Sequence, residues 1–206
     1  MLALIATTTP SSYAQKYFTQ TCIATGTSAN RECNSACTLI KTVPLNNNAI
    51  LLATPINAGL NAHPIGVWYK QVGSIWYWSV INQDAKPMLD GSTFNVEYYA
   101  IPDPNFQFVH HVYQPGATQS IFTSYIDHVN LNGNPKANFR YIANGNGTNL
   151  YPISFKYDVA VGKWYLSNDN HKALDLGAAY NIVIYSINAF GKSDIPLDTI
   201  HIKKKP

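Results

Sequence analysis

Outward aromatic rings followed by amide and carboxyl groups are the residues of this chain most suited to binding chemistry. The candidates lie on two neighbouring predicted strands and in the loop after them: Trp68, Tyr77, Asn82, Gln83 and Asp84. A flat ring can stack on the apolar face of a sugar, and amides and carboxylates can bond its hydroxyls. This pattern predicts a carbohydrate-binding surface. The alternative is that Trp68 packs against a second domain or a partner chain.

A second polar group contains histidines on two predicted strands, residues 106–113 and 120–128: His110, His111, Asp127 and His128. Zinc takes three or four nitrogen, oxygen or sulfur ligands. Because successive strand side chains point to opposite faces, only one residue of each adjacent pair could join a site. A metal pair of His110 and His128 is therefore the weaker interpretation. We expect strand histidines without a metal or a cofactor.

Short catalytic motifs are absent from the sequence, including the Gly-x-Ser-x-Gly elbow, the His-Glu-x-x-His zinc motif and phosphate-binding glycine loops. His63 precedes Pro64, and we expect it to bond the backbone in a turn. The sequence thus favours a protein that is not an enzyme. The enzymatic alternative is a hydrolase whose site lies between two domains and uses His63, Asp84 or the His110 to His128 group.

Composition excludes several classes of protein. Of the 206 residues 46% are apolar and 12% are charged, so the chain can bury enough surface to fold. Outside the basic tail at 203–206, eleven basic residues balance eleven acidic ones, and no basic stripe predicts a nucleic-acid partner. No apolar run approaches the length of about 18 residues that a membrane-spanning helix needs.

The N-terminal part suggests export. Residues 1–16 start with a short apolar run and contain Ser12-Tyr13-Ala14, which resembles a signal-peptidase site. We interpret them as a signal-peptide remnant, with a disordered arm as the alternative, and expect a secreted or extracellular protein. In an oxidising compartment the three cysteines would allow one disulfide, Cys22 with Cys33 or Cys37, and would leave one thiol over.

An internal repeat sets the organisation of the chain. Four segments recur with a displacement of 86 to 88 positions: 45–48, 63–69, 76–79 and 91–96 match 131–134, 151–157, 164–167 and 177–182. Both copies consist of short apolar and aromatic runs separated by Asn, Gly, Pro and Asp. We therefore predict an all-β protein of two tandem antiparallel β-sandwich domains, residues 17–101 and 106–202. The short connector at 101–105 should keep the domains in contact.

Comparison of the two copies predicts which side chains are buried. Apolar positions that both copies share should face inward, and positions that differ should face outward. Trp68 matches Lys156 and should therefore face outward. The inward set is Ile65, Val67 and Tyr69 with Ile153, Phe155 and Tyr157; Trp76 and Trp78 with Trp164 and Leu166; and Phe94, Val96 and Tyr98 with Tyr180, Ile182 and Ile184.

The whole repeat resembles an uncharacterised bacterial domain of unknown function found in predicted secreted proteins. The resemblance is carried by Leu-Asn-Asn-Asn at 45–48, His-Pro-Ile-Gly-Val-Trp-Tyr at 63–69, Trp76, Asn-Gln-Asp at 82–84 and the segment 91–96. It implies a β-rich exported domain and no particular activity. The stretch 174–193 also resembles the last strands of fibronectin type III and other immunoglobulin-like domains, in which Tyr180 would bond upstream backbone.

These features together predict a secreted binding protein that recognises a glycan or another cell-surface component. Two tandem copies would increase avidity. The alternative function is structural: an adhesive or protein-binding module, including a homo-oligomer, in which Trp68 docks another chain.

Overall fold

The computed structural model describes residues 15–23, 30–32, 37–41, 43, 48–56, 60–100, 106–115, 120–145 and 149–185. The predicted arm before residue 15, the connector at 101–105 and the basic tail at 203–206 lie outside the described residues. So do Cys33 and the side chain of Cys37.

The described chain is all-β, as the alternation of apolar runs and turn residues predicts. It contains no helix that is long and apolar enough to cross a membrane. The strands are β1 (Gln15–Thr21), β2 (Arg31–Glu32), β3 (Cys37–Ile40), β4 (Ile50–Pro55), β5 (Ile65–Val72), β6 (Ile75–Asn82), β7 (Thr93–Tyr99), β8 (Phe106–Val112), β9 (Thr123–Ile126), β10 (Asn138–Asn144), β11 (Ile153–Asp158), β12 (Lys163–Asn168) and β13 (Ala179–Tyr185).

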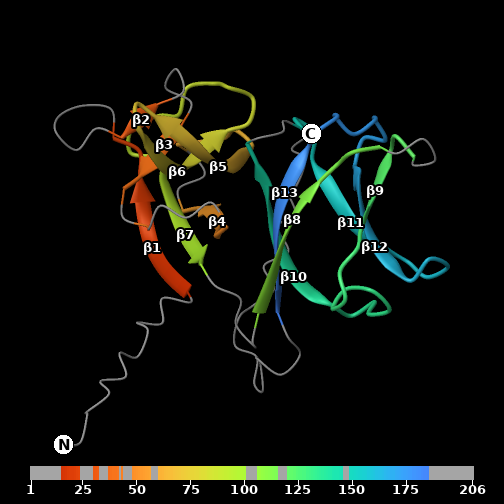
Figure 1. Ribbon diagram of the computed structural model, residues 1–206. Helices are drawn as coiled ribbons and strands as arrows, with labels where there is room; N and C mark the ends of the chain where they lie inside the picture. Colours follow the sequence, from red (N-terminus) through yellow and green to blue (C-terminus); the bar gives the residue numbers. More distant parts are fainter. Residues whose placement is uncertain are drawn as a thin grey trace, which may run out of the picture.

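The strands form three sheets, with the orders β1-β7-β4, β2-β3-β6-β5-β10-β13-β8 and β11-β12-β9 (Figure 1). We call β1 to β7 the first half and β8 to β13 the second half. In the first half β7 lies between β1 and β4, and in the second half β13 lies between β8 and β10. The seven-stranded sheet contains strands of both halves, so the division into two domains stays a prediction.

The two halves join through strands β5 and β10. Ala143 pairs with Gly66 and Asn144 with Val67 in a parallel arrangement. Every other pairing among the described strands is antiparallel, so the strands within each half pair as the predicted antiparallel sandwiches require. The approach is close, because a Cβ added to Gly66 would lie 2.9 Å from the carbonyl oxygen of Ala143.

Two apolar cores support this arrangement. The first core contains side chains of both halves, with Val67, Trp78 and Tyr98 packed in one cluster with Ile142 and Val183. The second core belongs to the second half and is built around Ile126, Leu166, Leu174, Tyr180 and Ile182. The halves therefore contact each other, as the short connector predicts.

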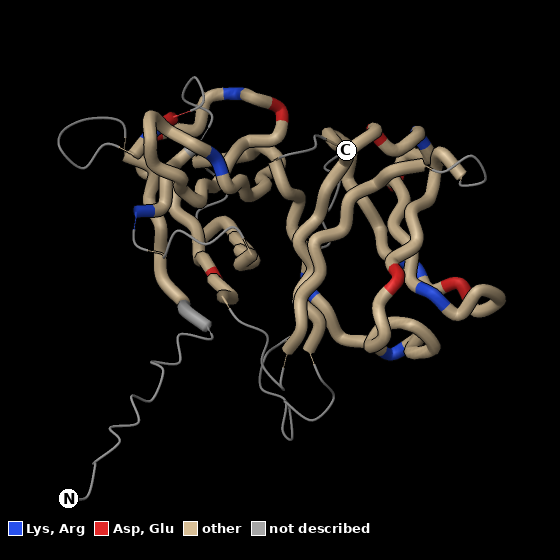
Figure 2. The backbone as a smooth tube through the Cα atoms, viewed as in Figure 1, with Lys and Arg blue, Asp and Glu red and all other residues tan. Residues whose placement is uncertain are grey.

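Strand β7 carries a charged contact between the halves. Glu97 is only 8% exposed. Its carboxylate forms an ion pair with the Arg140 guanidinium on β10 and accepts a hydrogen bond from the Tyr99 hydroxyl. Burial disfavours the charge on Arg140, but Glu97 and Tyr185 together outweigh this effect and raise the pKa of the guanidinium. Elsewhere the charged residues are dispersed along the described chain (Figure 2).

Candidate functional site

The β5–β6 hairpin presents an aromatic wall on one face. Tyr69 pairs with Trp78 and Gln71 with Trp76, which places these four side chains on the same side of the sheet. The ring of Tyr69 stacks on that of Trp76, with centroids 5.4 Å apart and planes 18° apart, and it lies 5.2 Å from Trp78. Trp78 is buried in the first core, whereas Trp76 is 45% exposed.

This wall borders a cleft of about 920 Å³ at the junction of the halves. The opposite side consists of Phe108 and His110 from β8, Asn144 from β10 and Asn181 from β13, and residues 48–50 at the start of β4 complete it. The parallel β5–β10 junction makes both sides part of one continuous sheet.

Asn181 is the centre of the polar floor. Its Oδ1 lies 3.1 Å from Nδ1 of His110 and accepts a hydrogen bond of 3.1 Å from Nδ2 of Asn144. Its own Nδ2 donates to the backbone oxygen of Leu51 at 3.4 Å. Asn181 and Asn144 are 1% and 4% exposed, and buried amides with this many partners hold a fixed geometry.

The lining is close to electrically neutral. None of the described residues that border the cleft is Asp or Glu, and the only Lys or Arg among them is Lys70. Lys70 occupies the face of β5 opposite Tyr69, and its Nζ lies 5.3 Å from the ring centroid of Trp68. The cleft therefore offers aromatic rings, amides and an imidazole rather than paired carboxylates.

Comparison with known families adds an identification. The sequence model described as Domain of unknown function (DUF7452) matches residues 11–98 and 66–184 of this chain. The chain belongs to this DUF7452 family. The two matched ranges overlap, and the presence of two copies stays a prediction. No curated protein and no solved structure matches the chain significantly, so the immunoglobulin-like resemblance also stays a prediction.

In this DUF7452 chain the two predicted aromatic site residues share the outer face of the hairpin. Trp68 pairs with Ser79 and Tyr77 with Lys70, so Trp68 and Tyr77 point away from the aromatic wall. Trp68 is half-buried, and a Cβ added to Gly145 of the second half would lie 2.9 Å from its Cβ. This contact agrees with the packing alternative for Trp68, although Trp68 also borders the cleft.

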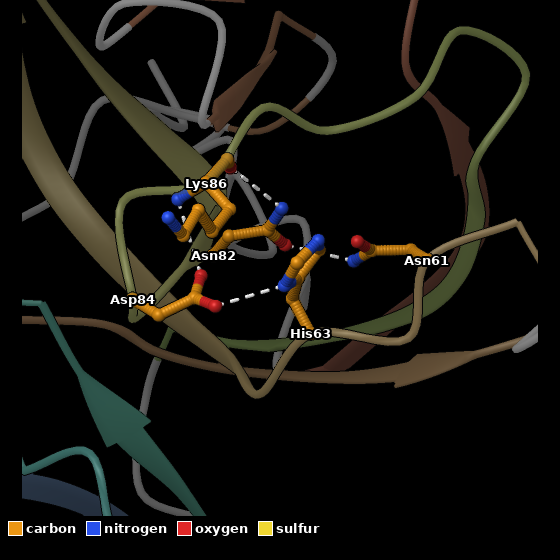
Figure 3. Close-up of polar contacts among 5 residues, drawn as sticks. All are labelled: Asn61, His63, Asn82, Asp84 and Lys86. Atoms are coloured by element: carbon orange, nitrogen blue, oxygen red, sulfur yellow. Dashed lines mark hydrogen bonds and ion pairs between the residues drawn. The ribbon is translucent and has the colours of Figure 1, made fainter.

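The other three predicted residues lie at the end of β6 and in the loop after it, and Figure 3 shows two of them, Asn82 and Asp84. Asn82 is buried. Its Oδ1 accepts a hydrogen bond of 2.8 Å from Nδ2 of Asn61, and its Nδ2 donates one of 2.9 Å to the backbone oxygen of Lys86. Asp84 accepts the backbone N–H of Lys86 and bonds Nδ1 of His63 at 2.8 Å. Desolvation opposes ionisation of Asp84, but these two partners lower the pKa of its carboxyl.

Gln83 reaches across to the second half, where its Nε2 donates to the backbone oxygen of Asn149 at 3.4 Å. The five predicted residues thus have different hydrogen-bond partners, and their joint role as one binding surface stays a prediction. His63 has the expected structural contact, but its partner is the Asp84 side chain and not the backbone.

A matching asparagine contact in the second half indicates that Asn82 is structural. Asn149 donates to Oδ1 of Asn168 at 2.7 Å, and Asn168 donates to the backbone oxygen of Lys172 at 3.2 Å. The same two amides therefore hold the loop after β12. Tyr151 stands where the first half has His63, and its hydroxyl accepts Nζ of Lys172 at 3.3 Å.

The predicted metal and disulfide residues have other surroundings. His110 bonds Asn181, and Nδ1 of His128 accepts the N–H of Asn130 at 3.2 Å. The described part of the chain contains no group of three or more His, Cys, Asp or Glu side chains arranged to hold a metal. Cys22 is buried, and its Sγ accepts a hydrogen bond of 3.8 Å from Nη2 of Arg31. The predicted partners Cys33 and Cys37 have side chains outside the described residues, so the pairing stays a prediction.

Trp76 was not among the predicted site residues, because the alignment of the two repeats matched it with Trp164. The strand pairs show a different match. Tyr69 pairs with Trp78 in the first hairpin, and Tyr157 pairs with Trp164 in the second, so the counterpart of Trp164 is Trp78. Trp76 does lie on the predicted inner face with Trp78, but its side chain is 45% exposed and not part of the core. Asn144 and Asn181 were missed because single Asn residues in the sequence are typical of turns and surfaces. Tyr180 is buried, and its hydroxyl accepts a hydrogen bond of 2.8 Å from Nδ2 of Asn149.

Proposed function

We propose that this DUF7452 protein is a carbohydrate-binding module and that the cleft at the junction of its halves is the binding site. The observation that carries the proposal is Trp76: a large ring, 45% exposed, stacked on Tyr69 at the border of the cleft. An aromatic platform of this kind buries the apolar face of a sugar ring. The nearby amides supply the directional hydrogen bonds that fix its orientation.

The chemistry of the lining favours an uncharged glycan. Asn144 and Asn181 are held in place by their mutual hydrogen bond, so the floor is organised before a ligand arrives. With neither Asp nor Glu among the described lining residues, the cleft supplies binding groups and no carboxylate pair for sugar hydrolysis. We therefore infer binding without turnover, by a secreted protein that recognises surface or extracellular glycans.

A glycan array probed with the intact protein, followed by calorimetry on the bound oligosaccharide, tests this function. Trp76→Ala should weaken binding at least tenfold, which corresponds to about 1.4 kcal/mol. Tyr77→Ala is the matched control, because Tyr77 is adjacent on the same strand but faces the opposite side. We expect it to bind within about twofold of the wild type.

Two results would contradict the assignment. If Tyr77→Ala and Trp68→Ala abolish binding while Trp76→Ala does not, the glycan site lies on the outer face of the hairpin. If the intact protein binds no glycan on a broad array, the carbohydrate function is wrong.

A protein-interaction module is the second candidate function. It is favoured by the β11–β12 hairpin, whose tip exposes Val159 and Val161 and whose strand β11 is an edge in the order β11-β12-β9. Exposed apolar tips and open edges are typical docking elements. Chromatography with light scattering tests this function: a stable oligomer that Val159→Ser together with Val161→Ser dissociates supports it, whereas a monomer at all concentrations excludes self-association.

A further inference from the structure

His110 offers a ligand one nitrogen whose chemistry is set by the protein. Its ring borders the cleft and is exposed, while its Nδ1 faces Oδ1 of Asn181 at 3.1 Å. In a neutral histidine, the hydrogen bond that one ring nitrogen makes with a neighbouring group decides which of the two nitrogens carries the proton. The surroundings of Asn181 therefore determine what His110 presents to the cleft.

The orientation of the Asn181 amide follows from its backbone partner. Its side chain lies 3.4 Å from the carbonyl oxygen of Leu51, which can only accept a hydrogen bond, so the amide nitrogen must point there. Oδ1 then points toward His110 and Asn144. In the reverse orientation, Oδ1 of Asn181 would face the carbonyl oxygen of Leu51, and Nδ2 of Asn181 would face Nδ2 of Asn144, which is also a donor.

This orientation fixes the imidazole. Oδ1 of Asn181 can only accept, so Nδ1 of His110 must carry the proton in their 3.1 Å contact. Nδ1 also lies 3.4 Å from the amide nitrogen of Asn144, which could donate only to an unprotonated Nδ1, but the contact with Oδ1 of Asn181 is shorter and favours the protonated Nδ1. In the neutral ring Nε2 is then a lone-pair acceptor, and none of the described residues bonds it.

We propose that His110 selects a hydroxyl-bearing ligand by accepting a hydrogen bond from its hydroxyl at Nε2, and that Asn181 is the positioning residue that holds the required tautomer. This inference rests on the proposed function and names the group that the site recognises. The aromatic wall can stack on the apolar face of many different sugars, whereas the Nε2 lone pair distinguishes a hydroxyl from a methylated oxygen. A ligand without a free hydroxyl at this point leaves the acceptor unpaired and binds less tightly.

The first part of the test needs no ligand. Proton–nitrogen correlation spectra of the ¹⁵N-labelled intact protein at pH 8 show which nitrogen of His110 is protonated, with His110→Phe used to assign the signal. We expect the Nδ1–H tautomer. A ring protonated at Nε2 overturns the inference, whatever the protein binds.

The second part uses cellohexaose, maltohexaose and mannohexaose as probes, together with their O-methylated derivatives. The inference expects at least tenfold weaker binding for His110→Phe and for the methylated probes. His110→Gln, whose side-chain oxygen can accept the same hydrogen bond, should retain affinity within about threefold.

The outcomes separate this inference from the proposed function. Binding that requires Trp76 but is unchanged in His110→Phe overturns the role of His110 and leaves carbohydrate binding in place. Absence of binding by the wild-type protein to every probe and to a broad array overturns carbohydrate binding, and the ligand role of His110 with it.

Discussion

Acidification should destabilise the protein through His111, the neighbour of His110 on the opposite face of β8. Its Nε2 lies 2.8 Å from Oγ of Ser124 on β9. Burial lowers the pKa of its imidazole from 6.5 to about 4, and the charge of the adjacent His110 adds to the effect. The folded protein therefore binds a proton at this site far more weakly than the unfolded chain does.

The sign of the pH dependence follows from this difference. Above pH 6.5 the ring is neutral in both states, and its contribution to stability is complete. Between pH 6.5 and pH 4 the unfolded chain takes up a proton that the folded state does not, so the free energy of unfolding falls with pH. At about 1.4 kcal/mol per pKa unit, the loss relative to pH 7 is about 2 kcal/mol at pH 5 and about 3 kcal/mol at pH 4.

Urea unfolding at pH 7, 6, 5 and 4, followed by tryptophan fluorescence, measures this loss. His111→Gln keeps a donor near the position of Nε2 but has no group that titrates, so its stability should fall less between pH 7 and pH 5. His171→Asn is the control: it removes an exposed histidine whose φ of 57° Asn tolerates.

The interval from pH 7 to pH 5 isolates histidines, since the carboxyls of Asp84, Asp127 and Asp158 have lowered pKa values and lose their contribution only at more acidic pH. Burial also lowers the pKa of His128, so some pH dependence should remain in the variant. If His111→Gln loses as much stability as the wild type between pH 7 and pH 5, the reasoning is refuted.

Two substitutions test the contact between the halves. Gly66→Ala would place a Cβ 2.9 Å from the Ala143 carbonyl oxygen, and we expect urea unfolding to show a loss of about 1 to 3 kcal/mol. Ser154→Ala, at the matching position of the edge strand β11, removes only an exposed hydrogen bond to the Asp169 carboxylate and should change stability by less than about 1 kcal/mol. Arg140→Met leaves the buried Glu97 carboxylate without its guanidinium and should cost about 2 kcal/mol. Adding Glu97→Gln should recover part of that loss, and strictly additive effects would contradict the pairing.

The sequence allowed the fold class and most strand faces to be predicted because those signals are local. Alternation along a strand places Val67, Phe94 and Val96 inward, and all three are buried. The same alternation places Trp68 and Tyr77 together on the outer face, which the strand register confirms. No longer-range information is needed for these assignments, since side-chain direction has a period of two residues.

The junction of the halves could not be predicted in this way. It joins Gly66 and Val67 to Ala143 and Asn144, and a parallel pairing of distant segments leaves no local pattern. Asn144 stands before Gly145 in the sequence, a combination typical of turns. In the structure it ends a strand and is buried beside Asn181, so the polar floor of the cleft depends on a pairing that the local sequence does not reveal.

Trp76 differs, because the sequence does contain the signal that identifies it. The first hairpin has eight residue pairs between Ile65 and Asn82 and the second has six between Ile153 and Asn168, so the two additional pairs lie at the tip. A gap placed at that tip, rather than after the Trp-Tyr segment, matches Trp78 with Trp164 and leaves Trp76 without a counterpart. An aromatic residue that has no counterpart in the core of the matching hairpin is free to serve a ligand. The longer hairpin therefore gives the first half a stacking platform that the second half lacks, and we expect one binding cleft per chain, not two.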